Sequence, residues 1–162
     1  MKELAEYRAK LIQRLEDSAQ TFRDACLQAN DPYAAGTDDW TVHQIAVHTR
    51  DVNQLVYGSR ARRTAAEDNP EFPNFDGEAY MRANYNPRQS LEEVLTSFVG
   101  DVQALVAWLH ALPAEAWSRV SRHTTLGRDL TLQSWVEKDL AHIEEHLKTV
   151  NKQTKRSEEA RK

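Results

Sequence analysis

The chain has little of several residue types, and each shortage excludes a class of protein. Among its 162 residues there is one cysteine, Cys26, so an internal disulfide framework is excluded and we expect a reducing compartment, the cytoplasm. It has five glycines, and the sequence contains no Gly-rich phosphate loop, serine nucleophile elbow, CxxC motif or paired-carboxylate signature. Nucleotide hydrolysis and serine-type catalysis therefore have no support.

Long apolar runs and an excess of positive charge are also missing. The N-terminal segment MKELAEYRAKLIQRLEDSAQ is charged throughout, which predicts neither a signal peptide nor a membrane anchor. The 21 basic and 25 acidic residues are scattered and give a formal net charge of −4 at pH 7. Without a broad cationic face for phosphate backbones, we expect neither nucleic acid nor membrane as a partner.

The composition that is present favours helices. Hydrophobic residues make up 40% of the chain and charged residues 28%, and with so few glycines this is typical of an all-α protein with a wet surface. The length suffices for one hydrophobic core. We predict one domain over residues 1–152 and a solvated C-terminal tail over residues 153–162.

Apolar residues recur at helical spacing in four segments. These predict helices over residues 2–29, from about residue 40 into the basic run that precedes Asn69, over 90–112 and over 131–150. Thr41 with Gln44 and Ser90 with Glu93 have the form of capping boxes, which mark the starts of the second and third helices. Gly36, with the Asn-Asp-Pro sequence before it, ends the first helix.

The segment between the second and third helices predicts a packed crossover. Residues 67–88 contain helix breakers beside four aromatic rings, Phe72, Phe75, Tyr80 and Tyr85. Such a long connection lets the helices on either side of it run in the same direction, so we predict a four-helix bundle of up-down-down-up order. Residues 113–117 suit a short helical turn, and residues 123–130 suit a tight loop or small hairpin.

Three of the six histidines are expected to face the core. His48 falls in the apolar series Ile45, His48, Val52, Leu55 of the second helix, while His142 and His146 stack on one side of the last helix. An inward histidine is commonly just hydrogen-bonded, and the HxxxH spacing arises by chance. Three uncompensated imidazoles would each cost about 1–3 kcal/mol, however, and shared coordination removes that penalty. We predict a metal site of His48, His142 and His146 with positions open for water or substrate.

The other histidines and the cysteine have less distinctive positions. His43 and His110 lie away from the apolar stripes of their helices, so both are expected to be exposed, and His123 is left open. Cys26 continues the apolar stripe of the first helix, which favours a core residue over a catalytic thiol.

Two further charged features have both a functional and a plain interpretation. Asp139, three residues before His142, could be an acceptor behind a metal ligand or a base, but a surface carboxylate is the favoured interpretation. Arg60, Arg62 and Arg63 could attract an anion, yet a short basic run at a helix end is usually solvated. We assign that run no role.

Two segments resemble the DinB-like (DNA-damage-inducible B) metalloprotein superfamily. They are Trp40 to His48, WTVHQIAVH, and Asp139 to His146, DLAHIEEH, and the resemblance spans roughly residues 5 to 150. It implies a four-helix bundle with a long crossover and a metal held at His48, His142 and His146. Relatives include transferases and isomerases that use mycothiol or bacillithiol, and family habit favours a homodimer.

Two functions follow as hypotheses. The first is an enzyme of thiol-transferase or hydrolase type, in which a divalent transition metal activates a thiol or water toward a small-molecule substrate. A low-molecular-weight thiol would then be a second cofactor. The second is a non-catalytic metal-binding stress module in which the ion ties two helices together. Zinc or nickel is the favoured ion, and iron also suits three imidazoles.

Overall fold

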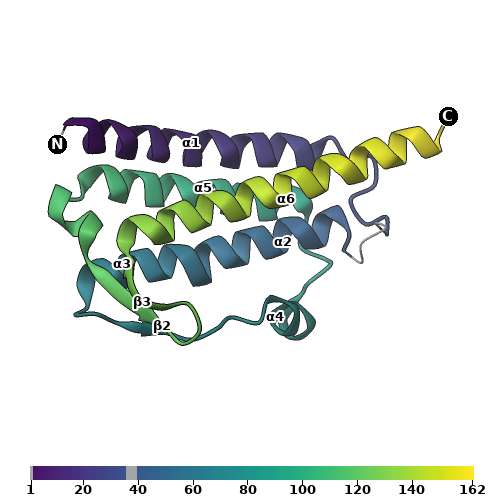
Figure 1. The fold of residues 1–162 in the computed structure, drawn as a ribbon. Helices are drawn as coiled ribbons and strands as arrows, with labels where there is room; N and C mark the ends of the chain where they lie inside the picture. The colour runs from purple at the N-terminus through teal and green to yellow at the C-terminus, as the bar shows by residue number, and fades with distance from the viewer. Residues whose placement is uncertain (1, 36–39) are drawn as a thin grey trace.

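The computed structural model describes residues 2–35 and 40–162, and these form a bundle of long helices with a small sheet beside it (Figure 1). The helices are α1 (Lys2–Leu27), α2 (Val42–Val52), a π-helical turn η1 (Asn53–Gly58), α3 (Ser59–Ala66), α4 (Gly77–Asn84), α5 (Leu91–Ala111), a 3-10 turn η2 (Ala114–Ser118) and α6 (Leu132–Ala160). The strands are β1 (Glu71–Phe72), β2 (Val120–His123) and β3 (Gly127–Thr131). Gly36, expected to help end the first helix, lies outside the described residues.

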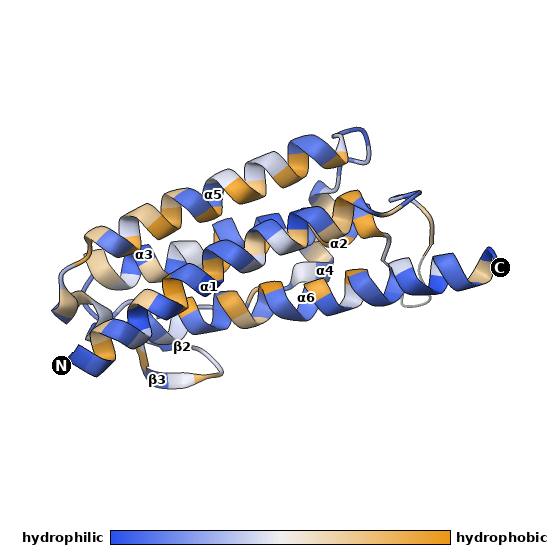
Figure 2. Cartoon of the chain, turned by 90° about the horizontal axis from the view of Figure 1, so that it is seen from above, coloured by the Kyte–Doolittle hydropathy of each residue, from blue (hydrophilic) through white to orange (hydrophobic). Residues whose placement is uncertain are grey.

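The long helices pack against one another as a four-sided bundle. α1 contacts α5 and α6, and α2 contacts the same two helices from the other side, while α3 continues along α6. In Figure 1 the residue colours progress from left to right along α1 and α6 and from right to left along α2, α3 and α5. Apolar residues recur along each helix in Figure 2, and the largest fully buried side chains include Phe22, Phe98, Leu15, Leu105 and Trp135.

Both predicted capping boxes start a helix. Thr41 accepts from the amide of Gln44 while the Gln44 side chain accepts from the Thr41 amide, so α2 has two of its orphan donors satisfied. The Ser90 side chain accepts from the amide of Glu93 at the start of α5. By length and composition α5 could cross a membrane, but its buried residues pack against α1 and α2 as those of a core helix do.

The second helix is interrupted by a π-helical turn that the apolar pattern did not predict. Residues 53–58 wind more widely than an α-helix, and a Cβ at Gly58 would lie 2.6 Å from the backbone oxygen of Asn53. Glycine therefore permits this turn. The extra residue rotates the helix, so Leu55, expected to face inward, is 44% exposed while Val56 is buried.

The crossover and a hairpin form an outer layer over α2 and α3 (Figure 1). β1, from the crossover, pairs in parallel with β2, and β2 pairs antiparallel with β3, so the predicted hairpin is confirmed and a three-stranded sheet is added to the expected all-α class. α6 continues ten residues beyond Val150. Gln153, expected in the solvated tail, is buried and donates to the backbone oxygen of Trp40 at 2.7 Å.

Candidate metal centre

The three histidines predicted as ligands come together at one point between α2 and α6. The Nε2 atom of His142 lies 3.2 Å from Nε2 of His48 and 2.9 Å from Nε2 of His146. One nitrogen from each ring lies within 4.8 Å of the other two, and all three side chains are partly buried. The three residues that the sequence singled out as metal ligands therefore lie close together in space.

His48 is held in place from two sides. It lies in the second turn of α2, whose start is fixed by the Thr41 capping box, and the Trp40 ring packs on its imidazole with centroids 4.8 Å apart. On the crossover side, a Cβ added to Gly77 would lie 2.9 Å from Cε1 of His48. The absence of a side chain at position 77 thus lets the crossover backbone pack directly on the ring.

His142 and His146 are neighbours on α6 because residues four apart lie on one helix face. Their ring centroids are 4.3 Å apart, and the Tyr57 ring packs on His142 from η1 at 5.7 Å. Burial and then the adjacent His146 lower the pKa of His48 to about 4. Burial, His146 and His48 lower the pKa of His142 to about 3, and burial lowers the pKa of His146. The rings are therefore neutral at pH 7 and offer lone pairs.

The donor set fits a divalent transition metal. Two imidazoles bound to one ion at about 2.0–2.1 Å place their nitrogens about 2.9–3.4 Å apart, which matches the two separations measured at His142. A neutral imidazole carries one N–H and one lone pair, so Nε2 of His142 cannot satisfy both neighbours by hydrogen bonds alone. Its Nδ1 is buried without a partner in the described part of the chain. A shared cation at the Nε2 atoms would remove the conflict there.

A pocket of about 280 Å³ opens beside the histidines. Its wall includes His48 and His142, apolar residues of α2 and η1, Arg60 of α3, and residues of the crossover and of the hairpin turn. The outer layer of the fold thus forms one wall of the space in front of the candidate ligands.

His123, left open by the sequence, lines this pocket and is 6% exposed. The backbone amides of Thr125 and Leu126 both donate to its Nδ1 atom at 3.1 Å. A backbone N–H group can only donate, so Nδ1 of His123 must accept with its lone pair. The neutral ring therefore carries its proton on Nε2. His123 is therefore a hydrogen-bond donor, and sequence periodicity missed it because it lies in a hairpin.

Asp139 was expected on the surface but is buried instead. Asp139 is 1% exposed, and with the Asn53 amide turned to donate, its oxygens lie 2.7 and 3.2 Å from that amide nitrogen. Burial raises the pKa of the Asp139 carboxyl well above its usual value. Asn53, the first residue of the π-helical turn, contacts this carboxylate. The spacing of apolar residues in an α-helix could not predict that contact.

His43, also predicted to be exposed, is fully buried. Its Nδ1 lies 2.7 Å from the Tyr85 hydroxyl and its Nε2 lies 2.6 Å from the backbone oxygen of Gln89. The prediction was wrong because the crossover covers the outer side of α2. His43 thereby ties the crossover to the helix that carries His48.

Of the remaining predictions about single residues, those for Cys26 and His110 are confirmed and that for Arg60 is wrong. Cys26 is buried in the core and His110 is exposed, as expected. Arg60 is only 8% exposed, contrary to the prediction of a solvated basic run, because the crossover residue Pro73 and the sheet cover it. Gly77 and Tyr57, which both contact the candidate ligands, were not proposed for the site.

Comparisons with known proteins agree with this architecture. The model of the DinB superfamily matches residues 12–150. Among solved structures, the chain is similar to YfiT from Bacillus subtilis, described as a probable metal-dependent hydrolase with an unusual four-helix bundle topology. The TM-score is 0.79 at 21% identity, over 94% of this chain and 88% of YfiT, which shows a shared fold. No curated protein matches significantly. Since the family match spans most of the chain, this protein belongs to the DinB superfamily.

Proposed function

We propose that the protein is a divalent-metal-dependent hydrolase of a small molecule, with His48, His142 and His146 as the metal ligands. The observation that carries the proposal is the convergence of three neutral imidazole nitrogens at the edge of a pocket. The description of YfiT as a probable metal-dependent hydrolase supports the same reaction class.

An ion held by three imidazoles supplies a Lewis acid that makes water or a thiol nucleophilic near neutral pH. The chain's own contribution is the position of the ligands and the wall of the pocket. Trp40 and Gly77 fix the His48 ring, and Tyr57 packs on His142. Residues of the crossover and the hairpin form the opposite wall of the pocket in which a substrate would bind.

The size of the pocket favours hydrolysis over thiol transfer. Pockets for drug-sized ligands have volumes of about 300–1,000 Å³, and this one, at about 280 Å³, lies just below that range. One small substrate and water fit such a space more readily than a substrate together with a bulky thiol cofactor. Cys26 cannot substitute for that thiol, because burial raises its pKa to about 12 and keeps it protonated.

The proposal is tested by measuring metal content and hydrolysis together. Untagged protein purified without chelator should contain close to one zinc or nickel ion per chain by elemental mass spectrometry. His48→Ala, His142→Ala and His146→Ala should each lose the ion and any hydrolysis of a panel of small esters and amides. His110→Ala is the matched control, since His110 is exposed on α5, and it should retain both.

The outcomes separate the two functional hypotheses. Absence of metal even after reconstitution, or equal loss in His110→Ala, would refute the metal site. Stoichiometric metal without hydrolysis of any substrate, combined with a lower melting temperature in His142→Ala, would favour the non-catalytic module instead.

A further inference from the structure

Arg60 carries a charge into the pocket beside the candidate metal ligands. Its side chain is 8% exposed, and one terminal nitrogen donates to the backbone oxygen of Pro73 at 2.8 Å. The guanidinium carbon lies 4.8 Å from the Trp135 ring centroid and 5.7 Å from that of Phe72. The two rings and the carbonyl hold the guanidinium in place, and Arg60 lines the pocket.

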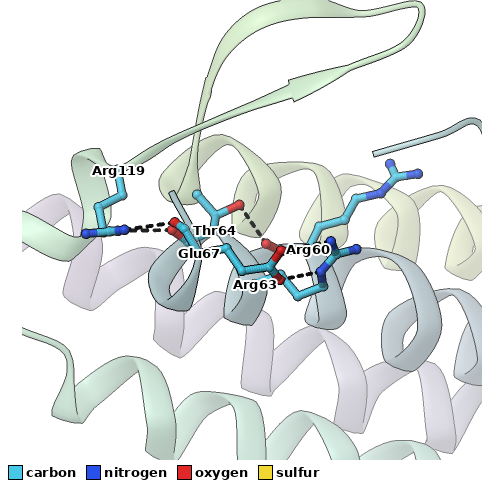
Figure 3. A network of polar contacts seen from close by, with 5 residues as sticks. All are labelled: Arg60, Arg63, Thr64, Glu67 and Arg119. Carbon is cyan, nitrogen blue, oxygen red and sulfur yellow. Dashed lines mark hydrogen bonds and ion pairs between the residues drawn. The ribbon is translucent and has the colours of Figure 1, made fainter. Parts of the chain in front are cut away.

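This buried charge has no counter-ion within residues 2–35 and 40–162. Arg63, one turn later on α3, pairs with Glu67 at 2.6 Å, and Arg50 on α2 pairs with Asp51 at 3.0 Å. Figure 3 shows the Arg60 guanidinium directed away from the Arg63–Glu67 pair. Burying an unpaired charge is costly, so a site of this kind is expected to gain an anion when occupied.

A second donor faces the same pocket. Because Nδ1 of His123 accepts from the Thr125 and Leu126 amides, the N–H of His123 is on Nε2. Burial, and then the charges of Arg60 and Lys138, lower the pKa of His123, so the ring is neutral at pH 7, and His123 and Arg60 line the same pocket. An anion bound at Arg60 would accept hydrogen bonds from the guanidinium and could accept one from His123.

The charge and lining of the pocket narrow the class of anion. Apart from the candidate metal ligands, Arg60 is the one formally charged side chain among the described residues that line the pocket, and none of them is acidic. The guanidinium, taken apart from any ion at the histidines, offers one positive charge, which suits the single negative charge of a carboxylate. Much of the remaining wall is apolar, from Val52, Val56, Phe75 and Leu126.

We propose that Arg60, assisted by His123, binds the carboxylate of a small, mainly apolar substrate and directs its other end to the three-histidine site. This inference rests on the proposed function, because only that function makes the bound carboxylate a substrate. The binding itself requires no metal, so it can be tested apart from hydrolysis.

The experiment uses butyrate and its neutral isostere butyramide as probes on the full chain freed of metal with a chelator. Amide chemical shifts in two-dimensional NMR report binding, and the amides of Thr125 and Leu126 beside His123 should move. We expect butyrate to bind about tenfold or more tightly than butyramide, as a charge-assisted pair with Arg60 implies. Equal binding of the two probes, or no shift of the hairpin amides by butyrate, would overturn the proposal.

Variants then assign the preference to one arginine. Arg60→Gln should remove the preference for butyrate, with a spectrum that still shows the folded state. Arg63→Gln is the matched control, since Arg63 also lies over Phe72, at 4.9 Å, but is ion-paired and does not line the pocket. If Arg60→Gln does not fold, the comparison of the two probes on the unaltered protein still tests whether the pocket binds a carboxylate. A retained preference in folded Arg60→Gln refutes the role of Arg60, whereas loss of metal or hydrolysis in the histidine variants bears only on the proposed function.

Discussion

Replacing Gly77 with alanine should weaken metal binding without unfolding the protein. The new Cβ would lie 2.9 Å from Cε1 and 3.4 Å from Nδ1 of His48. Carbon atoms in favourable contact are about 3.5–4.0 Å apart, so the ring or the crossover must move by about 0.6–1.1 Å. Metal sites tolerate deviations of about 0.2 Å in ligand distance. A displaced His48 should therefore lower the affinity for zinc by about 10–100-fold, as is typical when the support of a ligand is lost.

The affinity is measured by competition with a chromophoric chelator at pH 7. Gly100→Ala is the matched control, because a Cβ at Gly100 in α5 meets nothing within 4 Å. That variant should keep wild-type affinity and gain up to about 1 kcal/mol of stability from the helix preference of alanine. Wild-type affinity in a folded Gly77→Ala protein would refute the argument that Gly77 positions His48.

Two further predictions concern stability. Gly58→Ala should lower the free energy of unfolding by about 1–3 kcal/mol in urea titrations, because its Cβ would lie 2.6 Å from the Asn53 oxygen; an unchanged midpoint would show that the π-helical turn does not need glycine. In the folded, metal-free protein the pKa of His142 is lowered to about 3, whereas in the unfolded chain it is near the usual 6.5. As the pH drops below 6.5, the unfolded state therefore takes up a proton that the folded state does not. The free energy of unfolding falls as a result. Urea midpoints at pH 7 and pH 5 should therefore differ more for the wild type than for His142→Gln, and equal differences would contradict the assignment.

Much of the candidate site could be predicted because its signals are local. Helical winding places residues four apart on one face, so His142 and His146 had to be neighbours on any α-helix. The Thr41 capping box fixed where α2 begins and hence the face on which His48 lies. The spacing of apolar residues indicated the core position of Cys26 for the same reason.

The residues that were wrongly expected on the surface share a different cause, since each is covered by a segment distant in sequence. His43 is buried by Tyr85 of the crossover and by Gln89 just after it, and Arg60 is buried by Pro73 and the sheet. Periodicity assigns a residue to the core side or the outer side of its own helix. It does not report that the outer side is covered by another part of the chain.

The sequence by itself therefore determined the long helices, their starts and the pairing of His142 with His146, because these follow from hydrogen bonds and spacing within a few residues. The tertiary structure alone decided that Arg60 and His123 face one pocket. It also decided that Asn53 meets Asp139 and that Gly77 lies against His48. Those contacts join helices to the crossover and the hairpin, and their geometry arises only when apolar burial brings remote segments together.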